Sequence, residues 1–225
     1  MLSTIAATSL RELLRRRAAL SLVTLLPLAF YAARIDLEGQ AVRFLALGVG
    51  WAVATLALFS HVGSRHLDRR LAVVGASPTV LFAGRQIALI GTGLSIALVY
   101  LVLVSVTLDV QRLWAVGVLL ATTVLIAAPL GAVVSLVLPR ELEGALALLA
   151  IMATQMLADP DGTLAKLLPL WSTRELASYA VDPVGDEYLS RGLMHFVFVL
   201  VVAAVAAWVA AVVRLRPQRL PAVSV

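Results

Sequence analysis

The sequence contains no cysteine, and charged residues make up only 14% of its 225 residues. The lack of cysteine excludes disulfide bonds, thiolate chemistry and cysteine metal sites. The low charge is unlike that of soluble globular proteins, in which about a quarter of the residues are charged. Instead, 61% of the residues are hydrophobic and the mean hydropathy is +0.99. The apolar residues form uncharged runs of roughly 20 residues, which are typical of bilayer-spanning helices. We therefore predict a single all-α, polytopic membrane domain.

Motifs that carry chemistry are missing as well. The sequence has no Gly-x4-Gly-Lys-Ser/Thr phosphate-binding loop, no His-Glu-x-x-His metal motif and no Gly-x-Ser-x-Gly around a nucleophile. We therefore expect no enzymatic activity and no cofactor in this chain. The middles of the apolar runs lack Asp, Glu, Lys and Arg, which argues against ion-coupled transport, because such residues usually hold the coupling ion. We favour interfacial roles over proton transfer for His61 and His195, which lie near the ends of runs.

The apolar runs predict six spans, at residues 18–33, 44–62, 87–108, 113–138, 144–158 and 193–213. The fifth is too short to cross a bilayer alone at about 1.5 Å per residue. Residues 159–191 form one long segment on the far side of the membrane. This segment contains the turn signals DPDG and DPVG and a helical stretch over 163–181, which Pro169 interrupts.

The isoelectric point near 10.4 raises the question of a nucleic-acid partner. We expect no nucleic acid, because the basic residues flank apolar runs and do not form a polar face. If both termini are cytoplasmic, the cytoplasmic segments hold twelve basic residues and the far side holds six. Basic residues accumulate on the cytoplasmic side of membrane proteins, so this excess favours the orientation.

Residues 2–17 predict an amphipathic helix that lies in the membrane interface. At about 100° per residue, leucines share one arc of this helix and charged residues share the opposite arc. Ile5 and Arg17 break the pattern, and a charged cytoplasmic tail is the alternative. The residues that we expect to contact lipid tails and anionic headgroups are Leu10, Leu13, Leu14, Arg15 and Arg16.

The longest polar interruption on the cytoplasmic side is the loop over 63–85. Apolar residues at i, i+4 and i+7 predict a short helix with one apolar face and a charged opposite face. Gly75 can end this helix, and the Ser-Pro pair after it prevents its continuation. The helix either fits a groove on a soluble partner or lies flat on the inner leaflet. Its candidate contact residues are Arg65, Leu67, Asp68, Arg69, Arg70, Leu71, Val74, Ser77 and Pro78.

Three stretches are the most specific features of the chain: LRELLRRRAAL at 10–20, RRLAVVGASPTVLFAGRQ at 69–86 and LPLWSTRELASYA at 168–180. With the six spans, their order resembles that of the membrane subunits of type-2 ABC exporters. The resemblance covers a permease domain over about residues 1–216, followed by a short cytoplasmic tail at 217–225. In such exporters the loop often carries an acidic pair, whereas the corresponding SRHLDRR has Asp68 as its one acidic residue.

The resemblance implies a bacterial plasma-membrane permease that pairs with a second permease subunit, identical or different, and with separate ATP-binding subunits. The loop would be the helix that couples to the ATPase, and ATP would bind to that partner. Residues 159–191 would be re-entrant outer helices, with Pro169 and Trp171 at an outer gate; an ordinary surface cap is the alternative. The cargo would be apolar or amphipathic, such as a drug or a lipid. The alternatives are a haem-exporter-like permease of cytochrome c maturation and a non-transporting membrane scaffold or sensor.

Overall fold

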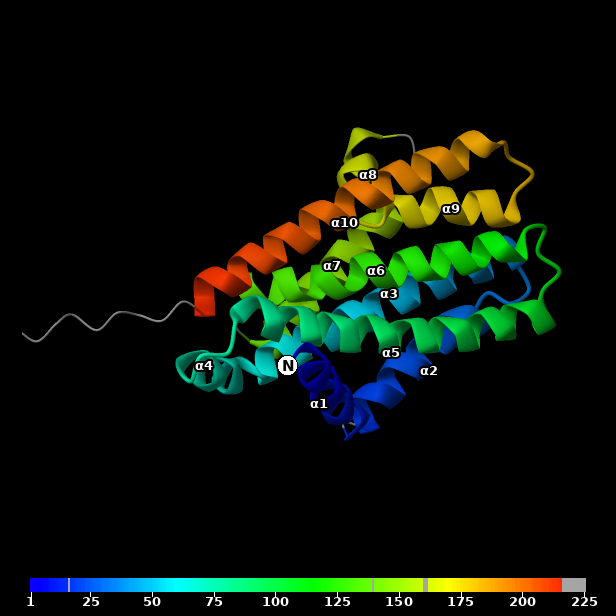
Figure 1. Ribbon diagram of the computed structural model, residues 1–225. Helices are drawn as coiled ribbons and strands as arrows, with labels where there is room; N and C mark the ends of the chain where they lie inside the picture. The colour runs from blue at the N-terminus through cyan, green and yellow to red at the C-terminus, as the bar shows by residue number, and fades with distance from the viewer. Residues whose placement is uncertain (16, 139, 160–161, 216–225) are drawn as a thin grey trace, which may run out of the picture.

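The computed structural model describes residues 1–15, 17–138, 140–159 and 162–215. These residues form ten α-helices and no strand (Figure 1), which confirms the predicted all-α class. The helices are α1 (Leu2–Arg15), α2 (Arg17–Ala32), α3 (Glu38–Gly63), α4 (Arg65–Val73), α5 (Pro78–Thr107), α6 (Leu113–Val137), α7 (Glu141–Leu157), α8 (Thr163–Leu167), α9 (Trp171–Val181) and α10 (Asp186–Leu215).

Four of these helices, α3, α5, α6 and α10, are long and apolar enough to cross a membrane. The membrane character of the chain is therefore confirmed at this level. Helices α2 and α7 have 16 and 17 residues, so each is about 25 Å long at 1.5 Å per residue, against a hydrocarbon core of about 30 Å. The count of six spans stays a prediction, because it requires these two helices to contribute crossings of their own.

Two helices begin earlier than the apolar runs suggest. Helix α5 begins at Pro78 rather than at 87, and α3 begins at Glu38 rather than at 44. Proline is favoured in the first turn of a helix, where its missing N–H is not needed. As a consequence, Arg43 and Arg85 lie inside long helices and not in the loops where the hydropathy pattern places them.

Helices α3 and α6 form the centre of the bundle, and most residues in their apolar stretches are buried. They approach closely at Gly131, where an added Cβ would overlap the carbonyl oxygen of Ala54 and lie 2.8 Å from the Cβ of Ala57. Small residues at such crossings allow close helix packing inside membranes. In contrast, α10 is largely exposed along its apolar length, as expected for a helix that faces lipid.

Helices α7 and α9 lie end to end along α3 and run in the same direction. The contacts that establish this are, in order along the bundle, Gly144 with Leu58, Met152 with Gly50, and Val181 with Gly39. Helix α9 therefore continues in the direction of α7, and the expected re-entrant arrangement is not confirmed. Helix α9 is mostly buried against α3, α6 and α10, which is also unlike a surface cap.

The N-terminus, α4 and the end of α10 at Leu215 lie at one end of the bundle, and the α5–α6 turn lies at the other (Figure 1). At the first end, Trp208 Nε1 on α10 donates a hydrogen bond to Thr79 Oγ1 on α5 (3.1 Å). At the second, Arg112 donates to the carbonyl oxygens of Tyr179 (2.6 Å) and Asp182 (3.2 Å). These bonds fix both ends of the bundle.

Candidate functional site

The short helix predicted in the cytoplasmic loop is present as α4, which joins α3 to α5. Its end also follows the prediction, because Gly75 has a φ of +95°, a left-handed conformation that glycine adopts at little cost. Ser77 is extended and Pro78 opens α5. Helix α4 is thus a distinct element between two long apolar helices.

A buried ion pair fixes α4 to α5. The guanidinium of Arg85 donates two hydrogen bonds to the carboxylate of Asp68, from Nη1 to Oδ2 (2.7 Å) and from Nη2 to Oδ1 (2.9 Å). Ser64 Oγ accepts a further bond from Arg85 and donates to Asp68 Oδ2 (3.2 Å). The side chains of Arg85 and Asp68 are only 6% and 14% exposed. A bidentate ion pair that is shielded from water is a strong interaction, and it also fixes the relative orientation of the two side chains.

A second arginine fixes the start of α4 to α6. Arg65 Nη2 donates to the carbonyl oxygens of Ser135 and Leu138, at the C-terminal end of α6. The last carbonyls of a helix lack partners within the helix and carry partial negative charge, so a guanidinium stabilises them. Burial lowers the pKa of Arg65 from its ordinary value, and the nearby charges of Arg214 and Arg69 lower it further. An arginine nevertheless stays charged at neutral pH.

Several apolar side chains of α4 and its C-terminal turn are exposed. No residue of α4 is buried. Leu67 is 52% exposed, Val73 is 81% exposed and Val74 is 78% exposed, while Leu71 is half-buried. The spacing i, i+4 and i+7 places Leu67, Leu71 and Val74 on one side of the helix, and we call these three residues the apolar edge of α4. Val73 lies on another side of the helix, next to the exposed Arg69 and Arg70. Clustered apolar groups on a polar segment indicate a contact surface.

The loop prediction needs two corrections. Asp68 was expected on the exposed charged face, but it is turned inward onto Arg85. Arg85 itself was placed at the edge of the loop and was not a candidate site residue. The signal that could have identified it is the Ser77-Pro78 pair, which marks a helix start as well as a stop. A helix that starts at Pro78 carries Arg85 inside the bundle.

The N-terminal helix α1 is also braced on α5. Ile5, which seemed to break the amphipathic pattern, packs against Gly84, next to Arg85. Leu13 is buried, whereas Leu10 and Leu14 are exposed. The predicted single apolar arc is therefore divided between a protein contact and a free side. Arg15 is the last, exposed residue of α1, and Arg16 lies outside the described residues.

The two predicted outer-gate residues lie at the break before α9. Pro169 lies between α8 and α9 and is half-buried, and Trp171 is the first residue of α9. Trp171 does not face lipid, because it is buried and its ring stacks edge-on against His195 of α10, with ring centroids 5.1 Å apart. Trp171 is therefore packed inside the bundle, and its place at an outer gate stays a prediction.

The chain matches no protein-family model and has no significant match among curated proteins. The order of sequence features and the geometry at α4 therefore carry the functional argument. That geometry combines a rigid mount on two long helices with an exposed apolar edge.

Proposed function

We propose that this chain is the membrane-spanning permease subunit of an ATP-driven exporter of the type-2 ABC class. It pairs with a second permease subunit and with separate ATPase subunits, which dock on α4 from the cytoplasm. The single observation that carries the proposal is the mounting of α4. Asp68 and Arg65 are bonded inward, to Arg85 and to the end of α6, while Leu67, Val73 and Val74 are left exposed.

A coupling element has to transmit force, which requires a stiff connection to the helices that move. Helix α4 meets this requirement, because charge-assisted bonds join it to α5 through Asp68 and to α6 through Arg65. A displacement of α4 by a partner is therefore passed directly to both helices. An ATPase that binds α4 differently in its nucleotide states would shift the populations of inward- and outward-open permease.

The alternative for α4 is a helix that lies flat on the inner leaflet, with its apolar edge in lipid and Arg69 and Arg70 on phosphates. The mounting favours a protein partner, because lipid binding needs no buried ion pair behind the helix. The proposed cargo is an apolar or amphipathic molecule, in keeping with the uncharged spans. ATP binds to the partner and not to this chain.

The test is co-purification of the permease with a phosphate-binding-loop ATPase from the native host, with and without charges on the apolar edge. Leu71→Asp and Val74→Asp should abolish association and transport while leaving the elution volume of the permease unchanged. Ile35→Asp, at an exposed position in the turn between α2 and α3 at the opposite end, is the matched control. If both α4 variants keep the ATPase and full transport, the coupling assignment is wrong.

A further inference from the structure

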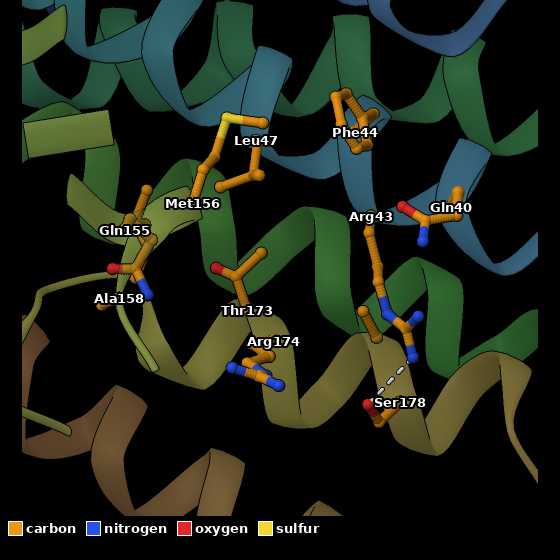
Figure 2. Close-up of a pocket in the computed structure, with 12 residues that line it drawn as sticks. Gln40, Arg43, Phe44, Leu47, Gln155, Met156, Ala158, Thr173, Arg174 and Ser178 are labelled. Atoms are coloured by element: carbon orange, nitrogen blue, oxygen red, sulfur yellow. Dashed lines mark hydrogen bonds between the residues drawn. The ribbon is translucent and has the colours of Figure 1, made fainter. Parts of the chain in front are cut away.

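The break between α7 and α9 opens a pocket of about 460 Å³ on the side of α3 (Figure 2). Figure 2 shows Leu47 of α3 beside Met156 near the end of α7, and Arg43 of α3 reaching toward Ser178 of α9. The volume of the pocket is in the range of sites that hold small molecules.

Among the described residues that line the pocket, two are arginines and none is acidic. The charge of Arg43 is neutralised, because its Nη2 donates hydrogen bonds to the carboxylate oxygen Oδ2 of Asp182 (2.5 Å) and to Ser178 Oγ (3.1 Å). Within the described residues, Arg174 has no hydrogen bond or ion pair. The neighbouring Glu175 does not neutralise it, because that carboxylate is paired with Arg191 of α10 (3.1 Å).

The Arg174 side chain is half-buried and lines the pocket. A guanidinium that is partly shielded from water gains most from a charged acceptor, because charge-assisted hydrogen bonds are stronger than neutral ones. An acid group of a ligand in the pocket would supply that acceptor. The Oε1 atom of Gln155 is covered by protein atoms and has no hydrogen-bond partner among the described residues, so a ligand in the pocket does not reach it.

The remaining lining is apolar. Phe44, Leu47, Met156 and Leu170 form the wall that faces these polar groups. The pocket extends along α9 from Thr173 to Ser178 and reaches Gln40 near the start of α3. An inorganic anion would leave this apolar wall bare, whereas a ligand with a short apolar chain would cover it.

We infer that this pocket binds an amphipathic anion, with its phosphate or carboxylate on Arg174, beside Arg43, and its apolar chain along Phe44, Leu47 and Met156. The inference rests on the chemistry of the pocket. It stands independently of the proposed ATPase partner.

The test measures binding to the purified full-length chain in nanodiscs of phosphatidylcholine, by titration calorimetry. The probes are decyl phosphate, decanol and inorganic phosphate. Decyl phosphate should bind saturably, and at least tenfold more tightly than either decanol, which lacks the charge, or inorganic phosphate, which lacks the chain. Equal binding of decanol or of inorganic phosphate would overturn the inference.

Two variants link this binding to the pocket. Arg174→Gln should weaken decyl phosphate roughly tenfold or more, since one charged hydrogen-bond partner is lost, and should leave decanol unaffected. Arg174→Lys keeps the charge and should restore most of the binding. Arg140→Gln, exposed and at the opposite end, is the control and should bind as wild type does. If Arg174→Gln expresses poorly, Gln155→Glu provides a second route, because its added negative charge should repel the probe. Unchanged affinity in a folded Arg174→Gln or Gln155→Glu chain would contradict the assignment.

The lipid composition of the nanodiscs shows whether the natural ligand is a membrane lipid or a free amphiphile. Phosphatidylglycerol added to the nanodiscs competes with decyl phosphate if the natural ligand is a membrane lipid, and does not compete if it is a free amphiphile. Either result is compatible with the same site chemistry. Because no ATPase is present in this assay, a failure of the coupling proposal would leave its outcome unchanged.

Discussion

Asp68 and Arg85 lie 17 positions apart in the sequence and form a buried, two-pronged ion pair that joins α4 to α5. The pair is unusual for this chain, whose apolar helices carry few charges. Its value for function is that the apolar edge of α4 is held at a fixed place at one end of the bundle.

Breaking this pair should destabilise the protein strongly. Asp68→Ala leaves Arg85 buried without a counter-charge, and removal of one partner of a buried pair costs about 3–5 kcal/mol. The matched control is Glu143→Ala, which breaks the exposed pair with Arg140 (3.0 Å) and should cost less than about 1 kcal/mol. The measurement is the melting temperature in detergent. A similar melting temperature for both variants would show that the Asp68–Arg85 pair has no special structural role.

The crossing of α3 and α6 gives a second prediction. Gly131→Ala should lower the melting temperature, because the new Cβ overlaps the backbone of Ala54 and overpacking typically costs about 1–3 kcal/mol. Gly91→Ala, on α5, meets no atom within 4 Å. That variant should be neutral or stabilising by up to about 1 kcal/mol, since alanine favours helices. Equal effects of the two substitutions would argue against a close α3–α6 crossing.

The number of crossings can be tested by labelling, since the sequence has no cysteine to interfere. Single cysteines at Leu142 and Pro183 flank the α7–α9 segment. If α7 and α9 together complete one crossing, a membrane-impermeant maleimide labels the first from the cytoplasm and the second from outside. Val73→Cys serves as the reference for labelling from the cytoplasm, and Ile35→Cys serves as the reference for labelling from outside. Labelling of both flanking positions from one side would show that α7 and α9 do not complete a crossing and would contradict the count of six spans.

The sequence predicted α4 and its end well, because Gly75 and Pro78 act locally on backbone geometry. It predicted the break at Pro169 for the same reason. The anchoring of α4 was missed, since the pairing of Asp68 with Arg85 depends on how two helices meet in space. The burial of α9 was missed as well, because its Ser, Thr and Glu side chains give it the composition of a surface helix.

The apolar residues of α1 are divided between a protein contact and an exposed side, and the sequence did not predict this division either. An amphipathic pattern identifies which residues avoid water, but it does not distinguish lipid from protein as the apolar surroundings. Ile5 packs on Gly84 because glycine leaves a notch in α5, a complementarity that no hydropathy pattern contains. Leu10 and Leu14 are exposed, and their contact with lipid stays a prediction.

The most direct test of the coupling proposal is photo-crosslinking from α4 in native membranes. A photoreactive amino acid at Val74, on the apolar edge, should link the permease to a protein that mass spectrometry identifies as a phosphate-binding-loop ATPase. The same probe at Ile35, at the opposite end, should not form this product. A Val74 probe that reacts with lipid and yields no ATPase adduct would contradict the proposal and would indicate a helix that lies on the membrane surface.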